Sequence, residues 1–282
     1  MKLCRFTAHG TTRLGKIAGD TVIDLSVVDG VGFSMRALIA DLETLRPALE
    51  AASGPAFPLA EVRLEAPIAD PQKYMAIGMN YEAHADEARA AGVPIPTSQL
   101  WFNKQVSCIS GPFDDIELPK VSDKLDYEAE LGVVIGKRCH DVSETDALSV
   151  IAGYLVTNDV TIRDWQMRSP TYTLGKSFDT HGPIGPWITT HDEVPNPHDL
   201  QMRLLLNGEV KQSSSTGDMI YGIRAQISYL STVMTLEPGD LIATGTPAGV
   251  GIATGSFMKD GDVVRVEVDG LGYIENRVVA ET

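Results

Sequence analysis

The segment LDYEAELGVVIG, residues 125–136, decides the fold of this chain and the position of its site. Glu128 and Glu130 stand two residues apart at the start of an apolar run, and side chains two apart in a β-strand share one face. Two carboxylates on one partly buried face repel each other by roughly 4 kcal/mol. A divalent cation is the simplest group that offsets this repulsion, and oxygen ligands favour Mg²⁺, Mn²⁺ or Ca²⁺ over Zn²⁺.

A third carboxylate is expected from the apolar run IAGYLVTND, residues 151–159, which ends at Asp159. Three carboxylates would leave about three of the six positions around Mg²⁺ for water or substrate. The spacing leaves two other interpretations open. The glutamate pair could be a solvated strand face with Asp159 in a turn, and Asp126 and Asp164 are further candidate ligands close by in the sequence.

The remainder of the main segment predicts a mixed, mainly β fold. Apolar runs predict strands over residues 131–136, 154–159, 240–245 and 263–268. Asn207-Gly208 and Asp269-Gly270 each lie between strand-like segments and predict hairpin turns. Helices are expected near residues 83–91, after the capping-box-like pair Ser143 and Asp146, and over residues 217–235.

Residues 1–66 predict a small N-terminal α+β domain ahead of a catalytic domain over residues 67–282. The first strands are short, alternate in polarity and are broken by Gly and Asp, which is typical of a β-meander. Ser34 is placed to cap one helix through residues 35–52, where leucines recur every three or four positions. The Gly- and Pro-rich stretch over residues 53–62 predicts a connector.

The composition excludes several classes of partner. The 282 residues are 43% hydrophobic and carry a formal net charge of −15, which argues against nucleic acid or an anionic membrane as partner. No run of 18 apolar residues and no signal-peptide pattern is present. The three cysteines form no CxxC pair, so we expect reduced thiols and a cytoplasmic protein.

Six segments in order resemble the fumarylacetoacetate hydrolase (FAH) family over about two thirds of the chain. They are IGMNYEAHADE (77–87), LDYEAELGVVIG (125–136), GYLVTNDVTIRDWQ (153–166), GKSFDTHGPIGPW (175–187), LNGEVKQSSSTGDMI (206–220) and LEPGDLIATGTPAGVG (236–251). The resemblance implies a rolled β-structure around a metal site, a small N-terminal domain, and a homodimer or higher homo-oligomer. Within the family, the sequence most resembles acylpyruvases and the bacterial members that act on 2,4-diketo-3-deoxy-L-rhamnonate or L-fuconate.

The resemblance also implies roles for individual residues. It assigns the metal to Glu128, Glu130 and Asp159, the same three carboxylates that the strand argument favours. It assigns a lid dyad to His84 and Glu87, which are three residues apart and so share one face of a helix. In this dyad Glu87 orients the imidazole and His84 takes a proton from water.

Further resemblances concern the lysine and the substrate. Lys176 resembles the active-site lysine of the family. Substrate-binding roles are expected for Tyr81, Lys104, Arg163, Gln166, Thr216 and Thr246. Two positions depart from the family pattern: Gln105 follows Lys104 where many members have proline, and His181 stands where relatives often carry cysteine. The first departure weakens the role of Lys104, and the second bears on substrate choice.

The resemblance implies Mg²⁺-dependent cleavage of the C3–C4 bond of a small anionic 2,4-dioxo acid, which gives pyruvate and a second acid such as lactate. A 2,4-didehydro-3-deoxy-L-rhamnonate or related sugar acid is favoured, since the polar run over residues 213–216 could contact a polyol tail. The same run could equally form a helix N-cap. Oxaloacetate decarboxylation, 2-hydroxyhepta-2,4-diene-1,7-dioate isomerisation, and a metal-stabilised 2-oxo-acid binding protein are the alternatives.

Overall fold

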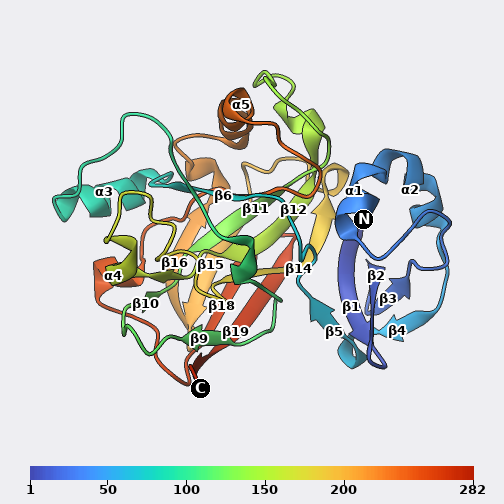
Figure 1. The fold of residues 1–282 in the computed structure, drawn as a ribbon, viewed down its shortest axis with the longest axis horizontal. Coiled ribbons are helices and arrows are strands. Elements are labelled where there is room, and N and C mark those ends of the chain that lie inside the picture. The colour runs from blue at the N-terminus through green and yellow to red at the C-terminus, as the bar shows by residue number, and fades with distance from the viewer.

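The computed structural model describes residues 1–282, and its main feature is a twelve-stranded sheet (Figure 1). Ten strands run in the order β4-β3-β2-β1-β14-β12-β11-β17-β6-β7, with β5 beside β1 and β8 beside β14. Their bounds are β1 (Lys2–Ala8), β2 (Thr11–Ala18), β3 (Thr21–Asp24), β4 (Ala56–Pro58), β5 (Arg63–Glu65), β6 (Tyr74–Gly78), β7 (Leu100–Asn103), β8 (Ile109–Ser110), β11 (Ala129–Ile135), β12 (Ile151–Asn158), β14 (Gly182–Thr190) and β17 (Leu241–Ala243).

A five-stranded sheet packs against the middle of the large one. Its order is β16-β15-β18-β19-β9, and its strands are β9 (Ile116–Leu118), β15 (Gln201–Leu206), β16 (Glu209–Ser215), β18 (Val263–Val268) and β19 (Gly272–Ala280). A separate short pair joins β10 (Leu125–Asp126) to β13 (Thr161–Ile162). The predicted mainly β class and both predicted hairpins, β15–β16 and β18–β19, are confirmed.

Strand β11 is buried on both faces, which explains its uninterrupted apolar run. Leu131 and Val133 belong to the core shared with the five-stranded sheet, together with Leu204 and Val266. Val134 points the other way, into a second core that includes residues of the N-terminal segment. A strand covered on both sides needs apolar residues at successive positions, because each successive side chain enters the opposite layer.

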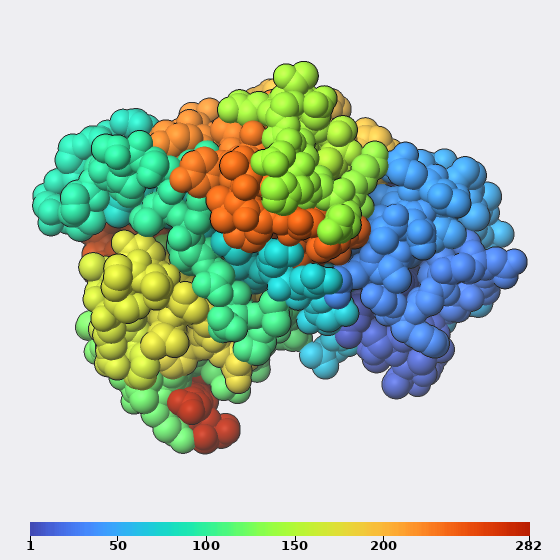
Figure 2. Space-filling view, turned by 45° about the horizontal axis from the view of Figure 1, so that its top comes forward, coloured from blue at the N-terminus to red at the C-terminus, as the bar shows by residue number.

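The N-terminal segment forms the predicted meander, and its first strand also extends the main sheet. β1 pairs with β2 on one side and with β14 on the other, where Lys2 lies opposite Thr189 and Leu3 opposite Ile188. Figure 2 shows these residues as a lobe at the end of the molecule away from residues 80–100. The division of the chain near residue 66 stays a prediction.

Two details of the N-terminal prediction were wrong. The single helix is divided into α1 (Met35–Ala40) and α2 (Leu42–Ala51), although Ser34 does cap α1 by accepting a hydrogen bond from the Ala37 N–H. The break at Asp41 lets apolar residues of both short helices enter the same core. The expected connector contains β4, an edge strand, which is where a strand tolerates proline.

The remaining helices lie around the sheets and carry much of the site. They are α3 (Glu82–Ala90), α4 (Arg163–Gln166), α5 (Ile223–Val233) and α6 (Gly251–Thr254). α3 confirms the helix predicted near residues 83–91. α5 begins later than predicted, because Ser215 and Asp218 form a capping box on a 3₁₀ turn at Thr216–Asp218. After Ser143 there is only a 3₁₀ turn, Ala147–Val150, since Ser143 and Asp146 bond each other without starting an α-helix.

No helix of the chain combines the length and the apolar character needed to cross a bilayer.

Candidate active site

The three carboxylates predicted as metal ligands lie together in the structure. Glu128 directly precedes β11, and the antiparallel register of β11 with β12 sets Ala129 opposite Asn158. The Asp159 N–H donates to the Glu128 carbonyl at 2.9 Å, so the end of β12 is held beside the start of β11. Ligand oxygens of Glu128, Glu130 and Asp159 lie within 4.8 Å of one another, and all three residues are buried. The interpretation as a solvated strand face is therefore wrong.

Three buried cations surround this carboxylate cluster unevenly. The Lys176 Nζ lies 2.7 Å from Glu128 Oε2 and 2.7 Å from Asp159 Oδ2. The Lys104 Nζ lies 2.6 Å from Asp159 Oδ1, and the Arg163 Nη1 lies 2.7 Å from Glu128 Oε1. The Lys176 ammonium therefore bridges two of the three carboxylates.

Glu130 is the carboxylate without a cationic partner. Its Oε2 accepts a hydrogen bond from the Gly245 N–H at 2.7 Å. Burial and the charges of Asp159 and Glu128 raise the pKa of Glu130 well above its usual value. Burial acts on Glu128 in the same direction, but Lys176 and Arg163 outweigh it and lower the pKa of Glu128 to about 2. Because Glu130 has no cationic partner, this all-oxygen cluster fits a hard divalent ion.

The two other candidate ligands have different roles. Asp126 accepts hydrogen bonds from the Gly251 N–H at 2.6 Å and the Ile252 N–H at 2.8 Å, and it pairs with Arg163 Nε at 2.6 Å. It therefore fixes α6 and the guanidinium together. Asp164 is exposed on α4 and accepts from Ser122, outside the cluster.

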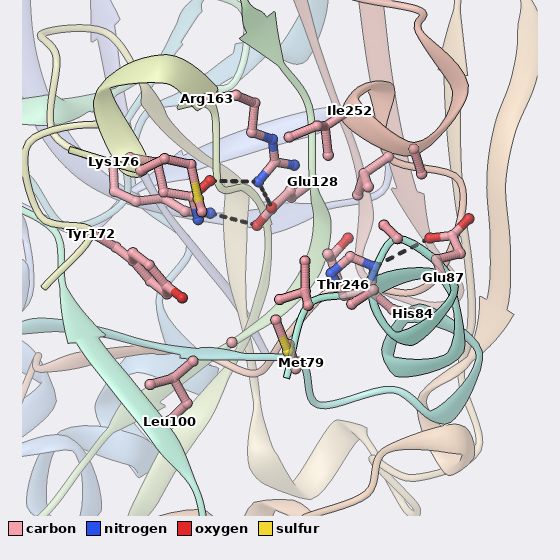
Figure 3. Close-up of a pocket in the computed structure, with 18 of the residues that line it drawn as sticks. Met79, His84, Glu87, Leu100, Glu128, Arg163, Tyr172, Lys176, Thr246 and Ile252 are labelled. Carbon is pink, nitrogen blue, oxygen red and sulfur yellow. Dashed lines mark hydrogen bonds and ion pairs between the residues drawn. The ribbon is translucent and has the colours of Figure 1, made fainter. Parts of the chain in front are cut away.

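A cavity of about 550 Å³ opens beside the carboxylate cluster (Figure 3). Seven residues predicted for the site line it: His84, Glu87, Glu128, Arg163, Gln166, Lys176 and Thr246. They come from α3, the start of β11, α4, the loop before β14 and the loop after β17. The fold thus brings residues more than 150 positions apart in the sequence to one cavity.

Helix α3 places the predicted dyad at the cavity. His84 Nδ1 and Glu87 Oε2 are 3.2 Å apart. The other oxygen of Glu87 accepts a hydrogen bond from the Gly249 N–H at 3.0 Å, which ties the helix to the loop after β17. His84 is near enough to contribute to the lowered pKa of Glu128. The Glu87 carboxylate thus holds the His84 imidazole at the cavity wall.

Three predicted substrate-binding residues are absent from the cavity wall. The buried Lys104 ammonium donates hydrogen bonds to Asp159 Oδ1 and to the Lys176 carbonyl. Tyr81 is buried in a β-bridge with Met219, and the Thr216 Oγ1 accepts from the Leu200 N–H at 3.0 Å. Substrate-binding roles for these residues stay predictions. The polar run over residues 213–216 is also outside the wall, and its Ser215 serves as an N-cap.

Sequence reasoning missed Gln212, which positions the loop after β17. Its Oε1 accepts from the Ala129 N–H at 2.9 Å, and its Nε2 donates to Thr246 Oγ1 at 2.9 Å and to the Pro247 carbonyl. One buried amide therefore connects the start of β11 to Thr246. The only signal was a polar residue facing inward from β16, and such a residue can have many partners.

Behind the cluster, His181 is buried and hydrogen-bonded through Nε2 to the Glu117 carbonyl at 2.8 Å. Burial lowers the pKa of His181 from 6.5 to about 4. As the pH falls, the unfolded chain takes up a proton on His181 near pH 6.5, whereas the folded protein does so only near pH 4. The contribution of neutral His181 to the free energy of unfolding is therefore complete above pH 6.5. It is lost between pH 6.5 and pH 4, by about 1.4 kcal/mol per pH unit.

We therefore expect His181→Gln to reduce the acid sensitivity of the protein. Glutamine still has a donor for the Glu117 carbonyl but does not titrate. Between pH 7 and pH 4 the variant should lose about 3 kcal/mol less free energy of unfolding than the wild type. Urea unfolding at pH 7, 5.5 and 4 measures this, and equal losses in both proteins would contradict it.

Several known proteins are similar to this chain in sequence and in fold. Residues 73–279 match the family model described as fumarylacetoacetate (FAA) hydrolase C-terminal. A Burkholderia cenocepacia protein named as a hydrolase is 44% identical over 281 residues, 96% of each chain. Maleylpyruvate hydrolase from Sphingobium sp. SYK-6, solved with manganese(II) and pyruvate, is 36% identical with a TM-score of 0.86, over 100% of both chains. The 2-hydroxyhepta-2,4-diene-1,7-dioate isomerase from Mycobacterium marinum is 34% identical with a TM-score of 0.81, over 100% of this chain and 99% of that one.

Proposed function

The chain belongs to the fumarylacetoacetate hydrolase family, and from this membership we propose that it hydrolyses the C3–C4 bond of an acylpyruvate, a 2,4-dioxo acid. The products are pyruvate and a second carboxylic acid. One observation carries the proposal: the His84–Glu87 pair lines the same cavity as Glu128, the member of the Glu128–Glu130–Asp159 cluster that reaches the cavity wall. The maleylpyruvate hydrolase complex with manganese(II) and pyruvate supports it, because pyruvate is one product of this reaction.

We propose that Glu128, Glu130 and Asp159 hold Mg²⁺, with Mn²⁺ or Ca²⁺ as other hard cations suited to oxygen ligands. When bound, the ion supplies Lewis-acid stabilisation of negative charge on the substrate oxygens. Lys176 and Arg163 add positive charge on the cavity wall beside Glu128, where an anionic 2-oxo acid needs it. The proposed substrate is therefore held by its pyruvate end.

In the proposed reaction His84, oriented by Glu87, takes a proton from a water molecule. The hydroxide oxygen bonds to C4, and the electron pair of the C3–C4 bond passes to the pyruvate fragment as an enolate. A proton then returns to C3, so one water is added across the broken bond. Lys176 and Arg163 face the charge that develops, and Gln166 and Thr246 provide polar contacts on the same wall.

The isomerase relative favours a second candidate, the isomerisation of a 2-hydroxy-diene dioate at the same site. Hydrolysis is the first choice because the His84–Glu87 pair supplies a base for water. The sugar-acid substrate suggested by the sequence is the finer alternative within hydrolysis. We also propose that the protein acts in the cytoplasm as a homodimer or higher homo-oligomer; its three buried free cysteines agree with a reducing compartment.

The test is a substrate panel with Mg²⁺ and an EDTA control, in water enriched in ¹⁸O. The panel holds acetylpyruvate, maleylpyruvate, a 2,4-dioxo-3-deoxy sugar acid, oxaloacetate and a 2-hydroxy-diene dioate. We expect pyruvate and one ¹⁸O atom in the carboxylate of the released acid, with turnover lost in EDTA. CO₂ release would assign a decarboxylase, a product of unchanged mass an isomerase, and pyruvate binding without any turnover a binding protein.

A further inference from the structure

The positive charge of the cavity is confined to one end. Arg163 and Lys176 both bond Glu128 at 2.7 Å, and His84 also lies near that carboxylate. No other lysine, arginine or histidine lines the cavity. A substrate whose pyruvate end occupies this region would find no cation for a second carboxylate elsewhere on the wall.

The wall away from this end is apolar and continuous. Leu100 and Phe102 lie two apart on β7 and both line the cavity, as same-face residues of a strand do. Phe102 meets the Tyr172 ring edge-on at 6.0 Å between centroids, and its own ring lies 5.0 Å from the Lys176 Nζ. The apolar wall therefore begins directly beside the charged end.

Figure 3 shows Leu100 and Met79 across the cavity from Arg163, whereas Ile252 of α6 lies beside Arg163. Thirteen of the 21 lining residues are hydrophobic, so the apolar wall covers most of the cavity. Gly78 lies opposite Leu100 in the β6–β7 pair, and a Cβ there would lie 3.3 Å from the Leu100 side chain, so the glycine leaves room for Leu100.

We propose that Met79, Leu100, Phe102 and Tyr172 form an acyl subsite for an uncharged, apolar acyl group of several carbons, aliphatic or aromatic. This inference rests on the proposed function, because it concerns the group attached to C4 of the acylpyruvate. It differs from what the names of the solved relatives suggest, since maleylpyruvate and a diene dioate carry a second carboxylate. It also differs from a polyol tail, because the Tyr172 hydroxyl is the one polar side-chain group of this subsite and most hydroxyls of a polyol would meet carbon.

The physical reason is the cost of leaving a polar group unpaired. A buried hydroxyl or carboxylate without a partner loses at least about tenfold in affinity, whereas each buried methylene gains about fourfold. The cavity volume of about 550 Å³ is in the range of sites that enclose molecules larger than acetylpyruvate. Chain length and terminal charge of the acyl group should therefore change kcat/KM in opposite directions.

The experiment compares acetyl-, butanoyl- and hexanoylpyruvate with the analogue of hexanoylpyruvate that ends in a carboxylate. We expect kcat/KM to rise about fourfold per methylene, and the carboxylate analogue to fall at least about tenfold below hexanoylpyruvate. Leu100→Lys should reverse that preference by supplying a cation. Leu174→Lys is the matched control: Leu174 is exposed and outside the wall, so the preference should be unchanged.

A binding series separates this proposal from the proposed function. Pyruvate, 2-oxohexanoate and 2-oxooctanoate cannot be cleaved as acylpyruvates, and calorimetry with Mn²⁺ should show tighter binding with each added methylene. Cleavage of acetylpyruvate with no gain from chain length, or with preference for the carboxylate analogue, would overturn the acyl subsite alone. Tighter binding of the longer 2-oxo acids without turnover of any acylpyruvate would overturn the proposed reaction and leave the subsite standing.

Discussion

Glu130→Gln should abolish metal-dependent turnover while leaving the metal-free protein at least as stable as the wild type. Glu130 is a buried carboxylate without a cationic partner, and burial together with Asp159 and Glu128 raises its pKa. Glutamine has the same shape, keeps an acceptor for the Gly245 N–H and carries no charge. The substitution therefore removes repulsion from the metal-free site and removes a ligand from the loaded one.

The two effects have opposite signs, and two measurements separate them. Calorimetry should show Mn²⁺ affinity reduced by more than about 100-fold, because loss of even an outer partner of a metal ligand costs about 10- to 100-fold. Urea unfolding in EDTA at pH 8 should show no loss of stability. Asp164→Asn removes an exposed carboxylate nearby and is the control for net charge. Undiminished Mn²⁺ binding by Glu130→Gln would remove Glu130 from the proposed metal site.

His84→Asn should lower kcat by about 10²- to 10⁴-fold, the usual contribution of a positioned general base. Asparagine fits the same space and leaves Glu87 bonded to the Gly249 N–H, so the position of α3 is kept. Since His84 is outside the carboxylate cluster, Mn²⁺ and pyruvate binding should be retained. Loss confined to kcat is the signature of an interaction made in the transition state.

The control for His84 is Glu82→Gln, an exposed change on the same helix. It should leave kcat and metal binding as they are in the wild type. Turnover close to wild type in His84→Asn would exclude His84 as the base, and parallel loss of Mn²⁺ binding would indicate a structural role instead.

The features that sequence predicted are those governed by local rules. The spacing of Glu128 and Glu130, the turn at Asn207-Gly208 and the cap at Ser34 each depend on residues within a few positions of one another. Asp159 was also found, because β12 ends where it meets the start of β11. The dyad and Lys176 depended on the family resemblance, since a lone histidine, glutamate or lysine has no local pattern.

The features that sequence missed depend on long-range packing. The apolar wall comes from β7 and from the loop that carries Tyr172, and nothing in either segment indicates that they face each other. Asp126 was a candidate ligand by position, yet its oxygens are taken by Arg163 and by two N–H groups of a helix 125 residues away. Such partners are determined by tertiary structure, which neither periodicity nor propensity encodes.

The pairing of β1 with β14 means that the leading strands protect the catalytic sheet from self-association. Removing residues 1–66 would leave the N–H and C=O groups of β14 near Ile188 and Thr189 without partners along an open border. Bare strand borders recruit other chains, which leads to aggregation or domain exchange. A chain without residues 1–66 would keep every residue of the cavity. It would still need another segment paired with this edge of β14 to avoid aggregation.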